Sequence, residues 1–428
     1  MRDGGRISAV IEVLTDFGTR RVPLKVSIAD WARGARYAGA KDRAFISGLA
    51  LDVLRRRGSL EAVGGDLPGA VAVALRQMWG WPADRIATAY AEEPHGPGAL
   101  TDAQLERLET APLAESAWAD IPDFVRPMLE RIGDDPLAEI RASTQRAPVD
   151  LRVNTLKSDV ERALKALQPL GAEPGAMSAT ALRIPPPPAE ERGPNIDIHP
   201  AFQKGWVEVQ DEGSQLTALA AGPIDGAQVL DFCAGGGGKT LALAALMGNH
   251  GQIHAYDIDA RRLAPIFDRA RRAGVRNLQV VSPAEGTDRL DALRGKMDLV
   301  FVDAPCSGAG TWRRRPDTKW RLTENQLASR MKEQDEVLAS ASEYVRPGGA
   351  LVYVTCSPLA EENEDRIAAF LDSHDGFEPD SARDMMAAGA GLNADVSLPA
   401  EGVARTLRLS PATTGTDGFA VTRLKRIA

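Results

Sequence analysis

The sequence has few cysteines, few histidines and no long apolar run, and each shortage narrows the classes of protein it can be. Its 428 residues include 3 cysteines and 5 histidines. So small and odd a number of cysteines gives no disulfide framework and is typical of a reducing compartment. No run approaches the length that a membrane-spanning helix needs, and the N-terminus lacks an apolar signal core. We therefore expect a cytoplasmic protein with no membrane partner.

The histidines and cysteines also lack the spacing of a metal site. His95, His199, His250, His254 and His374 show no paired ligand spacing, and the cysteines are far apart in the sequence. Zinc sites usually show close pairs of such ligands. We predict no metal ion, and nothing in the sequence requires more than a monomer.

Composition and charge indicate a globular chain of more than one domain. At 428 residues the chain exceeds one typical domain. Hydrophobic residues make up 44% and charged residues 26%, the balance of a folded protein. The formal net charge of −8 weakens a nucleic-acid interpretation without excluding it, because binding depends on where Lys and Arg cluster.

Basic residues do cluster in several places. Arg55–Arg57 end a predicted helix, where either RNA phosphates or water could meet them. Trp312 and Trp320 bracket Arg313–Arg315 and Lys319, the mix of stacking and phosphate contacts that RNA loops favour. A structural tryptophan beside a solvated loop is an equally good interpretation of that segment. A further group of arginines is interpreted as an exposed helix face: Arg261, Arg262, Arg269, Arg271 and Arg272.

The pattern of the sequence changes twice along the chain. Residues 1–118 carry apolar residues at helical spacing, as at Leu49, Val53 and Leu54. Residues 119–200 alternate strand and helix patterns, a small α+β linker module in which Pro185–Pro188 predict an extended connector. From residue 201 to 428, short apolar runs alternate with helical patterns, which predicts an α/β domain with a parallel sheet.

A glycine-rich turn follows the first strand of the α/β region. It consists of Cys233, Ala234, Gly235, Gly236, Gly237, Gly238 and Lys239, between an apolar strand and a helical pattern. Glycines let a ligand approach bare backbone, and Asp257, at the end of the next strand, can accept hydrogen bonds from ribose hydroxyls. The turn fits neither the dinucleotide fingerprint nor a P-loop, where Cys233 would have to be glycine, so an NTPase is the weaker alternative. We predict a nucleoside cofactor, S-adenosyl-L-methionine.

Two of the cysteines follow apolar, β-branched runs that read as buried strands. Cys306 lies in the segment Asp303–Gly308, and Cys356 lies in Thr355–Ser357. Free cysteines are usually small buried hydrophobes. Because ligands bind beyond the carboxyl ends of parallel strands, we expect these two thiols to converge on one crevice instead.

A pair of thiols suits one demanding reaction. A thiolate is a strong nucleophile once its pKa is lowered, and its addition to carbon 6 of a pyrimidine makes carbon 5 able to accept a methyl group. The proton at carbon 5 must then leave and the enzyme thiol must be eliminated. Cys356, Cys306 and Asp303 supply a nucleophile, a base and a group for ring nitrogen 3.

The ordered motifs resemble the RNA (cytosine-5) methyltransferases of the RsmB/Nop/Sun type, most closely their bacterial ribosomal branch. The resemblance covers roughly Ile121 to the C-terminus. Its motifs are Val209–Gln215, Asp231–Cys233, Asp257–Asp259, Asp303–Gly308, Arg314–Trp320, Pro347–Gly349, Thr355–Ser357, Glu361–Asn363 and Asp417–Phe419. It implies a Rossmann-like class I methyltransferase domain acting on carbon 5 of a cytosine in RNA through a covalent cysteine–cytosine intermediate. Small-subunit (16S) rRNA is the first expected substrate and tRNA the second.

The resemblance also implies a role for each site residue. Cys356 would be the covalent nucleophile, Cys306 would assist proton removal and product release, and Asp303 would contact the target base near the cofactor methyl group. The turn from Cys233 to Lys239 would hold the methionine portion, with Lys239 reaching towards the active site, and Asp257 would bind the ribose. Residues 1–118 would form a NusB-like RNA-binding domain.

Two departures from the family pattern concern the cofactor. The family usually has Ala-Pro where Gly235-Gly236 stands here, and an acid directly after the third strand, where this chain has only the displaced Glu285. These differences bear on cofactor affinity more than on reaction type. The alternative function is therefore an RNA-binding ribosome-assembly factor with a degraded cofactor site.

Overall fold

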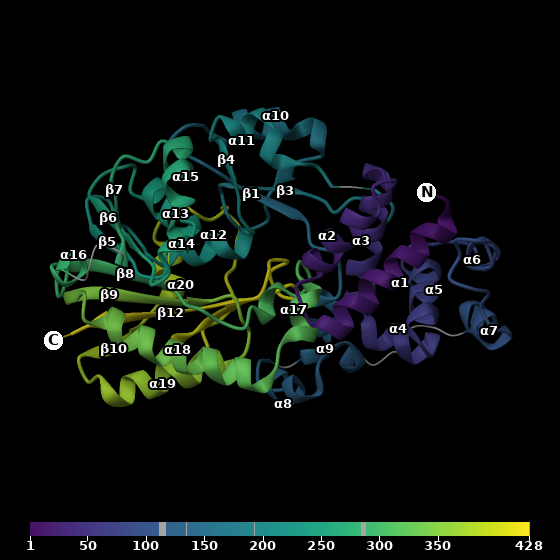
Figure 1. Cartoon of the computed structure of the whole chain (residues 1–428). Coiled ribbons are helices and arrows are strands. Elements are labelled where there is room, and N and C mark those ends of the chain that lie inside the picture. Colours follow the sequence, from purple (N-terminus) through teal and green to yellow (C-terminus); the bar gives the residue numbers. More distant parts are fainter. Residues whose placement is uncertain (111–116, 134, 192, 284–287, 428) are drawn as a thin grey trace. The chain divides into compact units, whose positions relative to one another are not determined.

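A computed structural model describes residues 1–110, 117–133, 135–191, 193–283 and 288–427. They form two compact units, which we describe one at a time (Figure 1). Unit 1 comprises Met1–Ala147, Pro186–Pro194 and Thr311–Thr323, and unit 2 comprises Pro148–Pro185, Asn195–Gly310 and Glu324–Ala428. Among the described helices, none is long and apolar enough to cross a membrane. The domain boundaries predicted at residues 118 and 200 stay a prediction.

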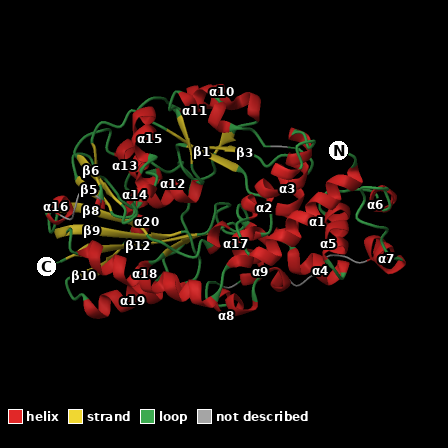
Figure 2. Ribbon diagram, in the orientation of Figure 1, coloured by secondary structure: helices red, strands yellow, loops and turns green. Residues whose placement is uncertain are grey.

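Unit 1 contains helices and no strand within its described residues (Figure 2). The α-helices are α1 (Asp3–Arg20), α2 (Leu24–Gly34), α3 (Ala40–Arg55), α4 (Arg57–Gly64), α5 (Leu67–Gln77), α6 (Ala83–Tyr90), α7 (Asp102–Thr110), α8 (Arg126–Leu129), α9 (Pro136–Ser143) and α17 (Pro316–Arg321). The short 3-10 helices are η1 (Ala117–Asp120) and η2 (Asp123–Val125). The likeness to NusB stays a prediction.

Local sequence sets the end of α4 and the start of α5 in unit 1. Gly65, with φ of +84°, ends α4, a conformation that costs little only for glycine. The Asp66 side chain then accepts a hydrogen bond of 2.7 Å from the Gly69 N–H and caps α5, which has Pro68 in its first turn. Pro185–Pro188 lie outside helices and strands, as predicted.

The basic and aromatic residues interpreted as RNA contacts are largely internal to unit 1. Trp320 Nε1 donates to the Leu54 carbonyl at 2.7 Å, and Lys319 Nζ donates to the Arg55 carbonyl at 3.0 Å. Arg55 itself bonds Asp52 at 2.6 Å and the Arg313 carbonyl at 3.0 Å. The RNA-contact interpretation is wrong for these residues, because α17 packs its polar groups onto the last turn of α3. Trp312 and Arg313 are buried as well.

Lys319 gives unit 1 a pH-dependent stability. Burial lowers the pKa of this side chain, which is 1% exposed, to about 7, against an attraction to Asp120 that raises it. In the unfolded chain a lysine has its ordinary pKa near 10.4, so between about pH 7 and 10 the unfolded state binds more protons. The wild-type free energy of unfolding should therefore rise with pH relative to Lys319→Met, by at most about 1.4 kcal/mol per pH unit, and the difference should be flat below pH 7.

Urea unfolding at several pH values, followed by tryptophan fluorescence, measures this difference, since 6 of the 7 tryptophans lie in unit 1. Lys25→Met, at an exposed lysine of the same unit, is the matched control and should keep the wild-type pH dependence. Parallel curves for wild type and Lys319→Met would contradict a neutral Lys319 in the folded state.

Unit 2 contains a small antiparallel sheet and a large mixed sheet. The small sheet has the order β2-β3-β1-β4, from β1 (Val149–Val153), β2 (Glu173–Pro174), β3 (Ala181–Ile184) and β4 (Val207–Val209). Helix α10 (Val160–Leu167) belongs to this part, together with the short η3 (Gln168–Leu170), η4 (Ile196–Ile198) and α11 (Pro200–Gln203). The hydrophobic core of this part includes Leu151, Leu167 and Leu182.

The large sheet has the order β10-β12-β9-β8-β5-β6-β7, with β11 paired to β12. Its strands are β5 (Gln228–Asp231), β6 (Gln252–Tyr256), β7 (Leu278–Val281), β8 (Met297–Asp303), β9 (Val345–Thr355), β10 (Phe377–Asp380), β11 (Leu407–Leu409) and β12 (Phe419–Arg426). Strands β5 to β9 are parallel, and β12 pairs antiparallel with β9. The chain runs outward from β5 in one direction and resumes at β8 on the other side, so β5 and β8 flank the topological switch point.

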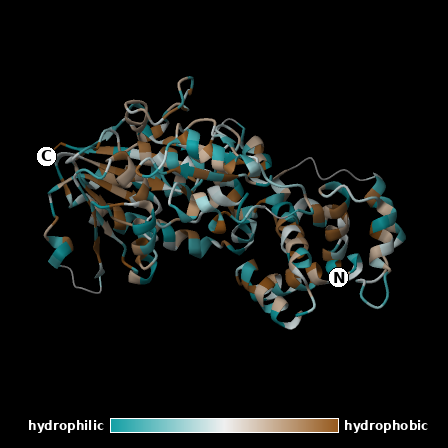
Figure 3. Cartoon of the chain, turned by 90° about the horizontal axis from the view of Figure 1, so that it is seen from above, coloured by the Kyte–Doolittle hydropathy of each residue, from teal (hydrophilic) through white to brown (hydrophobic). Residues whose placement is uncertain are grey.

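The central strands carry apolar residues on both faces because both faces of the sheet are covered (Figure 3). Leu299 and Phe301 of β8 join one core, while Val300 and Val302 join the other. The covering helices are α12 (Glu212–Leu219), α13 (Gly238–Leu246), α14 (Ala260–Leu263), α15 (Ile266–Ala273), α16 (Asp288–Asp291), α18 (Glu324–Ser342), α19 (Glu364–Ser373) and α20 (Ala382–Ala387). Helices α14 and α15 are separated at Ala264 and Pro265, because proline has no backbone N–H to continue the helix.

Candidate active site

The two predicted thiols meet at the carboxyl ends of neighbouring strands. Asp303 is the last residue of β8 and Thr355 the last of β9. The loops that follow bring Cys306 Sγ and Cys356 Sγ to 3.3 Å, a hydrogen-bonded pair of free thiols, both half-buried. The expected convergence of the two cysteines is what the structure shows.

One cleft of about 740 Å³ joins these thiols to the glycine turn. It is lined by Cys233, Ala234, Gly235, Gly236, Gly238, Lys239, Asp303, Cys306 and Cys356, and also by Ser214, Arg262, Arg269 and Arg330. Two predicted cofactor residues lie behind this lining. Asp257 is buried beneath the turn, and Gly237 faces Ile266 so closely that a Cβ would come within 2.5 Å of that side chain.

Lys239 connects the glycine turn to the strand that carries Asp303. Its Nζ lies 3.2 Å from Asp303 Oδ2 and donates to Ser214 Oγ at 2.8 Å, although the side chain is only 4% exposed. The ammonium therefore fixes the orientation of the Asp303 carboxylate. Ser214 was not predicted as a site residue; its only sequence signal was its place in the motif Val209–Gln215.

Two thiols of the site are weak acids. The hydrogen bond with Cys356, together with burial and the nearby Glu362 carboxylate, raises the pKa of Cys306 well above its ordinary value, against a smaller lowering by the Gly308 N–H. Either sulfur of the pair can donate the hydrogen bond that joins them. Burial likewise raises the pKa of Cys233, which behaves as a neutral part of the turn.

The glycine turn adopts backbone conformations that other residues avoid. Gly235 and Gly237 have φ of +49° and +84°, and α13 begins immediately after them. The Gly235 N–H donates to Asp257 Oδ2 at 3.0 Å, which holds the turn over the end of β6. Below it, Thr240 donates to Asp231 Oδ2 at 2.6 Å, and burial raises the pKa of Asp231 to about 7.

Arginines that sequence analysis placed on an exposed helix face hold this turn instead. Arg269 donates to the Gly236 carbonyl at 2.7 Å and pairs with the buried Glu208 at 3.1 Å; Arg272 pairs with Glu208 at 2.6 Å. Arg262 lies 3.2 Å from Asp257 Oδ2. The exposed-face interpretation is wrong for Arg269 and Arg272 and holds for Arg261, Arg262 and Arg271, whose side chains are 93%, 55% and 79% exposed.

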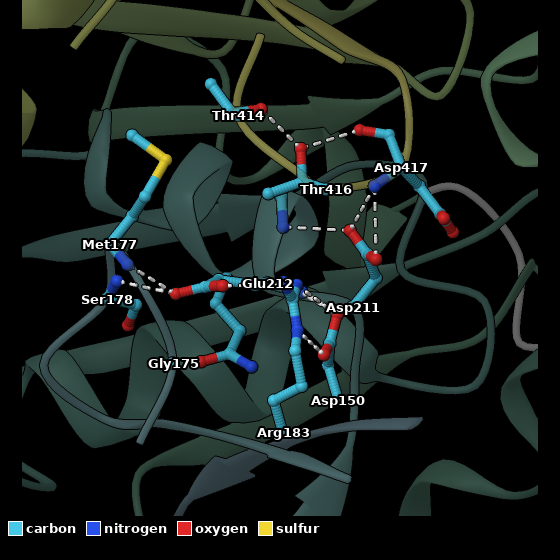
Figure 4. A network of polar contacts seen from close by, with 12 residues as sticks. Asp150, Gly175, Met177, Ser178, Arg183, Asp211, Glu212, Thr414, Thr416 and Asp417 are labelled. Atoms are coloured by element: carbon cyan, nitrogen blue, oxygen red, sulfur yellow. Dashed lines mark hydrogen bonds and ion pairs between the residues drawn. The ribbon is translucent and has the colours of Figure 1, made fainter. Parts of the chain in front are cut away.

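A polar network anchors the segment from Asp211 to Ser214 that forms one wall of the cleft (Figure 4). Glu212 Oε1 accepts the Met177 and Ser178 N–H groups at 2.7 and 2.9 Å, and Oε2 lies 3.2 Å from Arg183. Asp211 accepts the Asp417 N–H at 3.1 Å, so the small sheet, α12 and the C-terminal strand are tied at one point.

The loop after β9 is held from below by Asn363. Its Nδ2 donates to the carbonyls of Ser357 and Leu359 at 3.0 and 2.7 Å, and its Oδ1 accepts from Thr355 Oγ1 at 2.7 Å. The backbone on both sides of Cys356 is therefore fixed by one buried amide. The predicted acid Glu285 lies outside the described residues.

The fold and site define a class before any comparison. A doubly wound sheet with a glycine turn, an acid after the second strand and a cleft at the switch point is the architecture of a Rossmann-like, S-adenosyl-L-methionine-dependent methyltransferase domain.

Comparison with known proteins finds a matching family and similar proteins. Residues 218–425 match the family described as 16S rRNA methyltransferase RsmB/F. A protein of Citrobacter koseri named ribosomal RNA small subunit methyltransferase B is 34% identical over 279 residues, 63% of this chain and 62% of that protein. Its namesake in Sodalis glossinidius is 34% identical over 280 residues, with the same coverage of 63% and 62%. The chain thus spans about 62% of the length of these curated relatives.

Solved structures agree with this fold. The structure of PH0851 superposes with a TM-score of 0.72 at 24% identity, over 100% of this chain and 99% of that one. A methyltransferase homologue from Pyrococcus horikoshii gives 0.54 at 26% identity, over 72% and 100%. The resemblance and the S-adenosyl-L-methionine class predicted from the sequence are confirmed.

The residues of the turn fit such a cofactor. A Cβ at Gly238 would meet no atom within 4 Å, so the cleft side of the turn is open backbone. A carboxylate has lone pairs for several donors, and the Asp257 oxygens already accept from the Gly235 and Asp259 N–H groups, with Arg262 alongside. A ribose hydroxyl would use the acceptor position that these contacts leave, or displace Arg262, whose side chain is 55% exposed.

The Gly235-Gly236 pair is flexible, and the hydrogen bond from Arg269 to the Gly236 carbonyl restrains it. Removal of Arg269 should therefore weaken cofactor binding. Arg269→Ala frees the Gly236 carbonyl and leaves Glu208 with a single partner. We expect a loss of about 1–2 kcal/mol, or roughly five- to thirtyfold in the Kd for S-adenosyl-L-methionine, measured by isothermal titration calorimetry. Arg271→Ala on the same helix, where the arginine pairs only with exposed Asp268, is the control. Equal affinities for both variants would show that the clamp is unimportant.

Proposed function

We propose that this protein transfers a methyl group from S-adenosyl-L-methionine to carbon 5 of a cytosine in RNA, with small-subunit (16S) rRNA as the first candidate substrate. The observation that carries the proposal is the pair of thiols 3.3 Å apart in the same cleft as the glycine turn. A methyltransferase acting on oxygen or nitrogen needs no second thiol at its catalytic centre, whereas addition to a pyrimidine needs a nucleophile and a separate base.

The residues that would hold the cofactor are those of the turn from Cys233 to Lys239, for the methionine portion, and Asp257, for the ribose. When bound, S-adenosyl-L-methionine supplies an electrophilic methyl group on a sulfonium. Lys239, the last residue of this turn, is bonded to Asp303. It therefore sets the position of the carboxylate that contacts the target base.

Cys356 is the nucleophile in this scheme. Its thiolate donates an electron pair to carbon 6 of the cytosine, while Asp303 favours a proton or hydrogen bond at nitrogen 3. Carbon 5 then has the electron density to take the methyl group. Removal of the carbon 5 proton re-forms the ring double bond and expels the Cys356 thiolate, which restores the starting state.

Cys306 changes its acidity during the cycle. Before attack, its bond to Cys356 is the largest cause that keeps the pKa of Cys306 high. Once Cys356 becomes a thioether, that hydrogen-bonding and charged partner is gone, so Cys306 can release its proton into the cleft. Its thiolate is then a base of the right strength, beside the adduct, for the carbon 5 proton.

Substitution of each cysteine separates the two roles. Cys356→Ala should reduce methylation on the order of a thousandfold or more, because the nucleophile is lost, while the Kd for S-adenosyl-L-methionine stays within about twofold. Cys306→Ala should accumulate a covalent RNA adduct, seen as a retarded band on a denaturing gel. The double variant is the matched control and should form no adduct. An adduct with Cys356→Ala but not with Cys306→Ala would show that the roles are swapped.

Bisulfite sequencing of total RNA from a deletion strain identifies the substrate. Loss of a 5-methylcytosine in 16S rRNA supports the proposal, and loss of one in tRNA instead moves the activity to that RNA. If no methylated cytosine is lost and the protein fails to bind S-adenosyl-L-methionine, the RNA-binding assembly factor is the better description.

A further inference from the structure

A buried carboxylate lies directly beneath the loop that carries Cys306. Glu362 ends the short helix η7 (Ala360–Glu362), between β9 and α19, and is 0% exposed. Its Oε1 accepts the Ser307 N–H at 2.7 Å and Gln334 Nε2 at 3.0 Å, and its Oε2 accepts Ser307 Oγ at 2.5 Å. Three donors directed at two oxygens fit the ionised, acceptor-only form of the side chain.

This carboxylate has no cationic partner within the described part of the chain. Two other buried acids of unit 2 do have one: Glu212 pairs with Arg183, and Glu208 pairs with Arg269 and Arg272. A buried charge without a counter-charge is costly, and an uncharged glutamine could make most of the same hydrogen bonds. The charge at Glu362 therefore needs an explanation beyond holding the loop.

The hydrogen bonds of Glu362 fix the backbone on both sides of Cys306. Ser307, the next residue, is held by both carboxylate oxygens. Pro305, the preceding residue, has its carbonyl bonded by Gln334 Nε2 at 2.9 Å, and the same amide group reaches Glu362. Tyr353 of β9 donates to the Glu362 carbonyl at 2.8 Å and so fixes η7 itself.

The charge of Glu362 acts on the thiol between these anchors. The groups that face Cys306 are Cys356, Glu362, Tyr353, Asp303, Lys239 and Arg330. Asp303 is offset by Lys239, and Arg330 is paired with Glu333. Glu362 is thus the uncompensated charge, and Coulomb repulsion from it opposes ionisation of Cys306.

We propose that Glu362 is a positioning residue that holds the Cys306 loop and keeps the Cys306 thiol protonated, so that two adjacent cysteines act as one nucleophile and one proton carrier. This inference rests on the proposed function. Without the charge, either sulfur could be the thiolate of the pair. With it, ionisation of Cys306 is opposed, and Cys356 is left to act as the nucleophile.

Glu362→Gln removes the charge and keeps the shape, and titration of the thiol tests its effect without RNA. The rate at which iodoacetamide alkylates Cys306 is measured against pH in a Cys356→Ser background, with the labelled peptide identified by mass spectrometry. Glu362→Gln should move the titration of Cys306 to lower pH, with about a tenfold faster alkylation at pH 8 for each unit of fall. Asp335→Asn, at a half-exposed acid on α18, is the control and should leave the curve unchanged.

Ser307→Ala separates the charge from the hydrogen bond. It removes the Ser307 Oγ contact and leaves the Glu362 carboxylate, so the Cys306 titration should stay near the wild-type curve while the methylation rate falls several-fold. A titration shift as large as that of Glu362→Gln would show that loop geometry, not charge, controls the thiol, and would overturn the proposal. Glu362→Asp, which retains the charge, serves the same comparison if Glu362→Gln does not fold.

Single-turnover methylation against pH completes the test in the full-length protein. The alkaline limb of the profile should move to lower pH in Glu362→Gln and not in Ser307→Ala. An unchanged Cys306 titration in Glu362→Gln overturns the role of Glu362, whatever the protein methylates. A shifted titration together with a wild-type protein that methylates no RNA overturns the proposed function instead.

Discussion

The candidate site depends on the parallel pairing of β8 with β9. In their register Asp303 lies opposite Val354, so the chain leaves the two strands at nearly the same level. Cys306 lies three residues after Asp303, and Cys356 lies two residues after Val354. Two short loops from adjacent strands can only meet above the sheet, and the bond from the Ala304 N–H to the Val354 carbonyl, at 2.8 Å, extends the pairing up to that point.

Buried acids hold the segments that surround the paired ends of β8 and β9. Asp231 and Asp257 support the glycine turn, Glu208 holds two arginines against it, and Glu212 anchors the wall that carries Ser214. Each of these carboxylates accepts hydrogen bonds from backbone or side-chain donors on another element, which makes the loops at the end of the sheet rigid without apolar packing. The cleft can then be open to substrates while its walls keep their positions.

Much of the fold was predictable because the strands are short, apolar and bounded by glycine or acid. The alternating apolar and helical patterns did predict the parallel strands β5 to β9, and the glycine turn, Asp303 and both thiols lie at the crevice expected of a parallel sheet. Such features are local, since they follow from residue type and from the rule that strand ends carry the site.

The failures share a physical cause: a charged or aromatic residue does not reveal from its own sequence what it will contact. Trp320 and Lys319 bond a helix more than 260 residues away, which no periodicity signals. Arg262, Arg269 and Arg272 are spaced by seven and three residues, and this spacing did indicate a common face, but not that the face meets the turn. Glu362 lies in a three-residue helix, too short for any pattern. The roles of the site residues and the domain boundaries remain predictions.

In the proposed function, the pairing of Arg262 with Asp257 would give the cofactor and the RNA opposite responses to ionic strength. The arginine is half-exposed, so dissolved salt screens its attraction to the carboxylate and leaves the acid freer for a ribose. Binding of RNA, a polyanion, releases counterions, and the entropy gained from this release falls as the salt concentration rises. RNA would therefore bind more weakly over the same range. Turnover would then be fastest at an intermediate salt concentration, because the two effects of salt oppose each other.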